Sequence, residues 1–416
     1  MSKLAILGGT PVREKPISLW PIYDENEKNY LTKVLESHEW GKTSGKINEE
    51  FEKKYSQFQK VKHTITVCNG TVAIRIALFA AGIGPGDEVI VPSYTFVATA
   101  TAVLEANAIP IFADIDEDTF NISPESIKQL ITERTKAIIP VHFGGAPSDM
   151  AKIMEIANEY KLKVIEDAAQ AQGSTFHGKG VGSFGTAGTF SFQQSKNMTA
   201  GEGGAIVTDD DLIAEKVYSF HNCGRKPNNA WYLHFGIGGN YRLSEFQAGI
   251  LLAQLEREEK NLTIRRENAL YLNTLLSQIY GVEPIIYPDK IKSSYYLYVM
   301  KYKKEAFNNV PKRKFVEALN AEGITTLEGY PFPLYRQPMF IEKNFWKYGC
   351  PISCSVYNKD INYSKLSNPI SEKACDIGFW FPNLVLHGNK KDIENIVEAI
   401  YKIQQNSDEL KGDTIK

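Results

Sequence analysis

The sequence predicts an α/β fold, with a large three-layer α/β/α domain built on a mostly parallel sheet and a smaller α+β domain at the C-terminus. Three observations support this prediction. β-Prone runs alternate with helical patterns between residues 64 and 165, the 416-residue chain is too long for one core of ordinary size, and a long helical pattern begins at Glu245. We expect residues 1–265 to form the large domain and residues 266–416 the small one.

Strands and helices are expected in regular order along the chain. Helices are predicted at 25–35, 49–59, 70–82, 123–131, 150–157, 245–275, 312–322 and 391–403, and strands at 64–68, 88–92, 109–113, 137–141, 163–165, 189–192 and 295–301. Residues 329–376 are expected to be irregular but ordered, because they contain several aromatic side chains. Strands joined by helices of this length form right-handed crossovers, so ligands should bind at the carboxyl ends of a parallel sheet.

Composition and charge exclude several classes of protein. The net charge is −2, and no basic run is long enough to follow a phosphate backbone, so we expect no nucleic-acid binding. The apolar region at 65–83 is interrupted by Asn69, Gly70 and Arg75, so we expect no membrane span. The apolar run at the N-terminus is too short for a signal peptide, and we predict a cytoplasmic protein.

The five cysteines are expected to be free thiols. Cys68, Cys223, Cys350, Cys354 and Cys375 form an odd, scattered set, which is typical of proteins in a reducing cytoplasm. The last three could supply metal ligands, but no clear fourth ligand accompanies them. We therefore expect no metal site.

The predicted helix after the first strand begins where an anion could bind. Gly70 and Thr71 would present free backbone N–H groups at the positive end of the helix dipole. Asn69-Gly70-Thr71 is also the pattern of an ordinary helix cap, so by itself it does not show that an anion binds there. Tyr94, at the end of the next strand, could offer a flat stacking surface or could belong to the core.

Two charged residues follow later strands and should open onto the same edge of the sheet. Asp167 closes the strand in Glu166-Asp167-Ala168-Ala169-Gln170, and Lys196 lies in a polar loop that ends in glycines. Taken singly, Asp167 is typical of a helix cap and Lys196 of a solvated lysine. At one shared edge, the aspartate could face a cationic ring while the lysine projects its amine into a cleft.

Together these positions match the needs of pyridoxal 5′-phosphate. That cofactor requires a lysine for a Schiff base and an aspartate that keeps the pyridine nitrogen protonated, so that the ring can accept electrons. It also requires an aromatic side chain against the ring, and hydroxyl and helix N–H groups for the phosphate. Lys196, Asp167, Tyr94, Thr71 and Ser191 would fill these roles.

The sequence resembles the DegT/DnrJ/StrS aminotransferases, which are pyridoxal-phosphate enzymes of fold type I, like aspartate aminotransferase. The resemblance covers most of the chain and is most specific around Lys196. The segments that carry it are NGT at 69–71, PSYTF at 92–96, EDAAQAQG at 166–173, FSFQQSKNMTAGEGG at 190–204 and GGNYRLSEFQAGIL at 238–251.

The resemblance implies a role for each matching residue. Lys196 and Asp167 would be catalytic. The implied cofactor-binding residues are Gly70, Thr71, Tyr94, Asp167, Gln170, Ser191, Lys196 and Asn240. Gln170 would lie near the 3-hydroxyl of the ring and Tyr94 would cover its other face. Asn240 would reach the phosphate of the neighbouring subunit, which implies a homodimer with shared active sites.

The implied activity is ping-pong transfer of an amino group from glutamate or glutamine to a nucleotide-linked keto-sugar or a keto-cyclitol, in amino-sugar, antibiotic or surface-polysaccharide biosynthesis. LAILGGTPVR at 4–13 and HNCGR at 221–225 look most like the branch of glutamine:scyllo-inosose aminotransferases and 3-amino-5-hydroxybenzoate synthases. A synthase of the latter kind would use the same residues and stays an alternative. A regulatory homologue without catalysis is the other, although Lys196 and Asp167 are both present.

Overall fold

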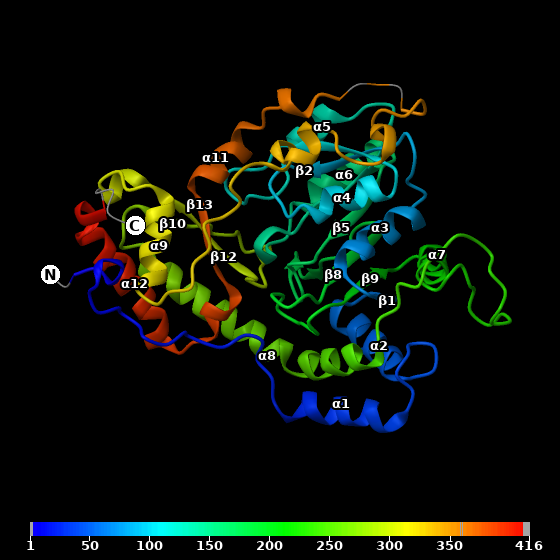
Figure 1. Ribbon diagram of the computed structural model, residues 1–416, viewed down its shortest axis with the longest axis horizontal. Coiled ribbons are helices and arrows are strands. Elements are labelled where there is room, and N and C mark those ends of the chain that lie inside the picture. The colour runs from blue at the N-terminus through cyan, green and yellow to red at the C-terminus, as the bar shows by residue number, and fades with distance from the viewer. Residues whose placement is uncertain (1–2, 358, 360, 411–416) are drawn as a thin grey trace.

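The computed structural model describes residues 3–357, 359 and 361–410, and a seven-stranded sheet forms its centre (Figure 1). The strand order is β1 (His63–Val67), β9 (Gly204–Thr208), β8 (Ala187–Ser191), β5 (Lys163–Asp167), β4 (Thr135–Ile138), β2 (Glu88–Pro92) and β3 (Ile109–Ala113). β9 is antiparallel to β1 and β8, and the other neighbouring pairs are parallel. The predicted α/β fold with a mostly parallel sheet is therefore confirmed.

Helices cover both faces of this sheet, which gives three layers. One layer holds α3 (Gly70–Ala80), α4 (Ala98–Glu105) and α7 (Asp211–His221), and the other holds α2 (Ile47–Gln59), α5 (Pro124–Leu130), α6 (Met150–Tyr160) and the first half of α8 (Glu245–Leu276). Within β2, Val89 and Val91 pack into the first layer, whereas Ile90 packs into the second. Because successive side chains of a strand point to opposite faces, strands covered on both sides are apolar throughout.

The second half of α8 packs against a smaller antiparallel sheet. This sheet has the order β10 (Val282–Pro284), β12 (Leu297–Tyr302) and β13 (Gly378–Pro382), and α9 (Lys312–Ala321) and α12 (Lys390–Gln405) share its core. Figure 1 shows α8 running from the central sheet to this smaller one. The domain boundary that we predict at residue 265 lies inside α8, and the division into two domains stays a prediction.

The remaining elements are short or peripheral. They are α1 (Glu25–Ser37), which packs on the outside of α8, the small sheet of β11 (Ile291–Lys292), β6 (Thr175–Phe176) and β7 (Lys179–Gly180), and α10 (Pro338–Ile341) and α11 (Pro369–Ile377). Among the described residues, no helix has both the length and the apolarity needed to cross a membrane.

The described part of the segment 329–376 is irregular but packed, as its aromatic residues predict. Tyr335, Phe340 and Tyr363 are buried in the core next to α3 and α4. The prediction of five free thiols is wrong in this segment, because Cys350 and Cys354 form a disulfide. Turns within Cys350–Cys354 bring the two Cα atoms to 5.1 Å, a separation that a disulfide can span.

Gly188 in β8 occupies a position that admits no side chain. A Cβ on residue 188 would lie 2.5 Å from the carbonyl oxygen of Gly182. We expect Gly188→Ala to lower the free energy of unfolding by about 3 kcal/mol, because the backbone of a central strand must move. Chemical denaturation of the two proteins measures the difference.

Gly84→Ala is the matched control for this substitution. A Cβ on residue 84 meets no described atom within 4 Å, so the variant should stay within about 0.5 kcal/mol of wild type. Equal midpoints for Gly188→Ala and Gly84→Ala would contradict the close approach of residues 182 and 188.

Candidate active site

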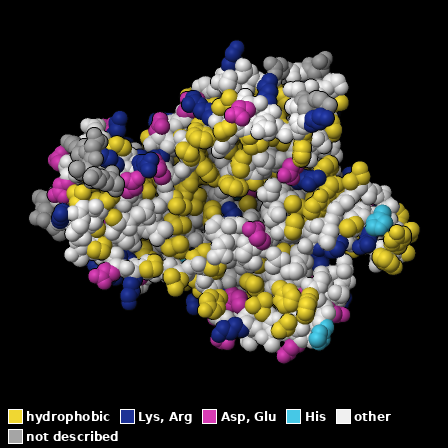
Figure 2. Space-filling view, in the orientation of Figure 1, with side chains coloured by type: hydrophobic (Ala, Val, Ile, Leu, Met, Phe, Trp, Pro, Cys, Tyr) yellow, Lys and Arg dark blue, Asp and Glu magenta, His cyan; other side chains and the backbone are white. Residues whose placement is uncertain are grey.

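A cavity of about 740 Å³ lies at the carboxyl ends of β1, β2, β5 and β8, between the central sheet and the smaller antiparallel sheet. Figure 2 shows a hollow between the two halves of the molecule, bordered by hydrophobic side chains. Six of the predicted site residues line the cavity: Gly70, Thr71, Asp167, Gln170, Ser191 and Lys196. The ends of parallel strands are where open α/β sheets bind ligands.

The start of α3 forms an anion-binding end of this cavity. The Asn69 side chain caps the helix by accepting the N–H of Val72 at 2.9 Å, which leaves the N–H groups of Gly70 and Thr71 without a partner inside the helix. Residue 70 must be glycine, since a Cβ there would lie 2.8 Å from the Cβ of Ser191. Backbone N–H groups, a hydroxyl and the positive end of the helix dipole together suit a phosphate group.

Asp167 is a buried carboxylate at the end of β5, with 5% of its surface exposed. Its Oδ2 accepts the Thr99 hydroxyl at 2.8 Å, and its Oδ1 accepts the N–H of Ala169 at 3.2 Å. Burial raises the pKa of this carboxyl, while the Thr99 hydroxyl, the Ala169 N–H and the Lys196 amine partly offset the shift. Such a site favours a cation beside the carboxylate, as the pyridinium of pyridoxal phosphate would be.

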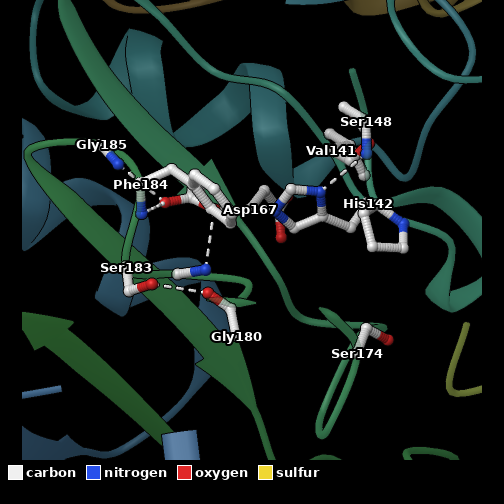
Figure 3. Close-up of polar contacts among 12 residues, drawn as sticks. Val141, His142, Ser148, Asp167, Ser174, Gly180, Ser183, Phe184 and Gly185 are labelled. Atoms are coloured by element: carbon white, nitrogen blue, oxygen red, sulfur yellow. Dashed lines mark hydrogen bonds and ion pairs between the residues drawn. The ribbon is translucent and has the colours of Figure 1, made fainter. Parts of the chain in front are cut away.

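The neighbouring residue, Glu166, holds the end of β5 in place from the opposite face of the sheet. Its carboxylate is fully buried and accepts the N–H groups of Gly182, Phe184 and Gly185 at 2.7 to 2.9 Å. The Nε2 of His142 donates to Glu166 at 3.1 Å, because its Nδ1 already accepts the N–H of Ser148. Figure 3 shows the turn at Phe184 and Gly185 on one side of this network and His142 with Ser148 on the other.

Lys196 projects from a loop that joins two adjacent strands. Residues 192–203 connect β8 to its antiparallel neighbour β9, and Ser191 pairs with Gly204 where the loop begins and ends. The Lys196 Nζ lies 4.3 Å from the centre of the Tyr296 ring, within the range of a cation–π contact. Among the described residues that line the cavity, Lys196 is the sole one with a cationic side chain.

The structure does not bring Tyr94 to the cavity that the other predicted residues line, and places it in the core. Tyr94 is 1% exposed and packs edge-on against Phe120, Phe143 and Tyr330, behind the cavity wall. Phe96, two residues later, is 58% exposed and lines the cavity instead. The chain leaves β2 at Pro92 without continuing as a strand, so strand alternation could not show which of the two aromatic rings faces the ligand.

Gln170 and Asn240 lie in different surroundings. Gln170 is buried at the cavity wall, where its Oε1 accepts the N–H of Gly144 at 2.8 Å. Asn240 is exposed and does not line the cavity of its own chain. It forms an isolated antiparallel bridge with Asn222, and the chain between these two residues is part of the segment that extends away from the body after α7 (Figure 1). The role of Asn240 in a neighbouring subunit therefore stays a prediction.

Sequence reasoning missed the aromatic wall opposite the sheet. Tyr296, Tyr330 and Trp380 line the cavity from segments that precede β12, follow α9 and lie within β13. Tyr330 and Trp380 pack against each other with ring centres 5.3 Å apart. Their sequence positions carried no signal for this, because the meeting of the two sheets brings them to the cavity.

Comparison with known proteins identifies the family. Residues 21–377 match the DegT/DnrJ/EryC1/StrS aminotransferase family. The chain belongs to this family. An L-glutamine:2-deoxy-scyllo-inosose aminotransferase from Streptomyces kanamyceticus is 35% identical over 420 residues, which cover 97% of each chain. The resemblance seen in the sequence is therefore confirmed.

Two solved structures share the fold of this chain. The crystal structure of 3-amino-5-hydroxybenzoic acid synthase has a TM-score of 0.85 and 30% identity, covering 95% of this chain and all of that one. NtdA from Bacillus subtilis, crystallised with the cofactor PMP, has a TM-score of 0.78 and 31% identity, covering 92% of this chain and 82% of that one. The prediction of a transaminase of fold type I is confirmed.

Asp167→Asn should raise the free energy of unfolding of the cofactor-free protein. The same substitution should slow amino transfer by the loaded enzyme. The raised pKa means that the folded state holds the proton more tightly than the unfolded state, so an ionised Asp167 opposes folding at neutral pH. The variant should unfold at a higher urea concentration than wild type at pH 7.5, and this difference should shrink as the pH falls. Amino transfer should fall by about a hundredfold or more, because the charge opposite the ring is lost.

Thr99→Val is the companion variant for this test. It removes the hydroxyl that Asp167 accepts and keeps the carboxylate, so it should lower the urea midpoint at pH 7.5. If Asp167→Asn also lowered the midpoint, desolvation would not be the dominant influence on this carboxyl.

Proposed function

We propose that the protein transfers an amino group from glutamine or glutamate to a keto-cyclitol or a keto-sugar, with pyridoxal 5′-phosphate as its cofactor. The observation that carries the proposal is one cavity lined by Lys196, the buried carboxylate of Asp167 and the start of α3. The similarity to an aminotransferase named for 2-deoxy-scyllo-inosose supports a cyclitol as the acceptor.

The residues of the cavity fit the cofactor by chemical type. Gly70, Thr71 and Ser191 would hold the phosphate, Asp167 would face the ring nitrogen, and Phe96 would lie against the ring. Bound there, pyridoxal phosphate supplies an electron-accepting ring that eases removal of a proton from the carbon bearing the amino group.

Lys196 would carry the proton during the reaction. Its Nζ would accept the proton from the α-carbon of the amino donor, and the Tyr296 ring, whose centre lies 4.3 Å from the Nζ, would hold the side chain in place through the cation–π contact. Tyr330 and Trp380 would exclude water from this part of the cavity, because they cover it with apolar surface.

We also propose that the active unit is a homodimer with shared sites, and we keep the predicted cytoplasmic location. The segment before Asn240 exposes large apolar side chains, with Trp231, Tyr232 and Ile237 between 73% and 89% exposed. A contiguous exposed apolar segment is typical of a protein interface. Docking on a second copy would cover it and could bring Asn240 to the phosphate end of the second cavity.

An activity like that of 3-amino-5-hydroxybenzoate synthase is the second candidate. The structural similarity to that synthase, with a TM-score of 0.85, favours it. The two activities can be distinguished in the second half-reaction, because they use different acceptors of the amino group. Free keto-cyclitols, nucleotide-linked keto-sugars and cyclic precursors of aminobenzoates would each be added to the amino form of the loaded protein, and the absorbance spectrum would show which of them takes up the amino group.

Lys196 should be the attachment point of the cofactor. After incubation with pyridoxal phosphate and reduction with borohydride, mass spectrometry should find the added mass on the peptide that contains Lys196. Lys196→Ala should gain no such mass and should lose amino transfer by about a hundredfold or more. A wild-type protein that binds no pyridoxal phosphate, or that is labelled at other lysines alone, would end the proposal.

Shared sites should allow two inactive variants to complement each other. Lys196→Ala and Asn240→Ala should each be impaired as homodimers, whereas a mixed dimer would contain one site with both residues intact. Co-expression in equal amounts should give about a quarter of the wild-type activity, since half of the dimers are mixed and each has one intact site. Activity no greater than that of the two variants measured separately would argue that each chain works alone.

A further inference from the structure

Asn197, the residue after Lys196, forms a buried amide pair with Asn383, which follows β13. Their exposed fractions are 1% and 2%. Asn383 Nδ2 donates to Asn197 Oδ1 at 2.8 Å, and Asn197 Nδ2 donates to the carbonyl oxygen of Ser294 at 3.1 Å. Rotating either amide would place two acceptors or two donors together, so the pair fixes the orientation of both side chains.

The pair joins the lysine loop to the aromatic wall of the cavity. The backbone N–H of Asn383 donates to the carbonyl oxygen of Tyr296 at 3.0 Å, and Trp380 precedes Asn383 by three residues. The hydroxyl of Ser294 donates to the carbonyl oxygen of Gln170 at 3.2 Å, which ties the same point to the end of β5. Segments distant in the sequence thus meet beside the lysine.

Burying amide groups is favourable only if their hydrogen bonds are made, so apolar side chains would hold the two sheets together at less cost. An oriented amide pair instead fixes the position of the two joined segments relative to each other, because its hydrogen bonds form only over a narrow range of distances and angles. The pair contacts the chain on both sides of the cavity and lies next to Lys196 in the sequence.

We propose that the Asn197–Asn383 pair positions the aromatic wall relative to Lys196 and thereby sets how tightly the cavity holds the amino donor. This inference rests on the proposed function. The pair acts through Tyr296 and Trp380 rather than through any reacting atom. Its loss should therefore weaken donor binding more than it slows the chemical step, and it should leave the phosphate end at α3 unchanged.

The test uses the loaded enzyme and the half-reaction with L-glutamine or L-glutamate, whichever reacts with wild type. In Asn197→Ala and in Asn383→Ala, the half-saturating donor concentration should rise about five- to tenfold, as expected for the loss of one or two buried hydrogen bonds, while the limiting rate changes less than about threefold. Pyridoxal phosphate affinity, from fluorescence titration of the cofactor-free protein, should change less than about twofold. The double variant should match the single variants, because the pair acts as a unit.

Asn268→Ala is the matched control. Its Nδ2 donates to the carbonyl oxygens of Leu386 and Gly388 at 2.8 Å, so this variant loses amide bonds to the turn after Asn383 without touching the lysine loop. It should be less stable to heat and yet keep the wild-type half-saturating concentration. If an alanine variant of the pair does not fold, Asn197→Ser and Asn383→Ser replace it under the same criteria.

Three results would overturn the inference while leaving the proposed function intact: an unchanged half-saturating concentration in the pair variants, a fall confined to the limiting rate, or single effects that multiply in the double variant. A wild-type enzyme that reacts with neither donor would overturn the proposed function itself, and this inference with it.

Discussion

The burial of the Glu166 carboxylate is the constraint on which the active site depends most. A fully buried carboxylate must be surrounded by donors, and here three backbone N–H groups and His142 supply them. Because adjacent residues of a strand face opposite sides of the sheet, this fixed point on one face holds Asp167 on the other. The hydrogen bonds to the Glu166 carboxylate thus determine where the charge of Asp167 lies. The Thr99 hydroxyl and the burial of Asp167 determine how strongly this charge attracts a cation.

The site combines two opposite electrostatic environments within one cavity. The start of α3 offers positive potential and exposed N–H groups, whereas Asp167 offers a negative charge in surroundings that solvate it poorly. A ligand that carries an anion at one end and a cationic ring at the other complements both. Lys196 lies between the central sheet and the aromatic wall. From there its amine could reach the ring of such a ligand without occupying the anion site at α3 or the position beside Asp167.

The sequence was sufficient for the half of the site that parallel strands build, and insufficient for the other half. Asp167 and Ser191 end strands, and Gly70 follows one, and the carboxyl ends of these strands must converge, so topology alone brings the three residues together. Tyr94 and Phe96 could not be separated in this way, because the chain between them is no longer a strand. Tyr296 and Trp380 reach the cavity through the packing of a second sheet, and no local pattern encodes that contact. The Cys350–Cys354 bridge depends likewise on turns that composition does not reveal.

Ser191 pairs with Gly204, so the two ends of the loop that carries Lys196 are held together by neighbouring strands. Its backbone is anchored at both ends, and Gln194 donates to Gly201 across it at 2.9 Å, so movement is left mainly to the four methylene groups of Lys196. Extra residues in this loop would have to bulge outward or shift β8 against β9, which would displace the amine. Changes in substrate range during evolution are therefore expected to accumulate in the segment 329–376 and in the aromatic wall, where length and side chains can vary without moving Lys196.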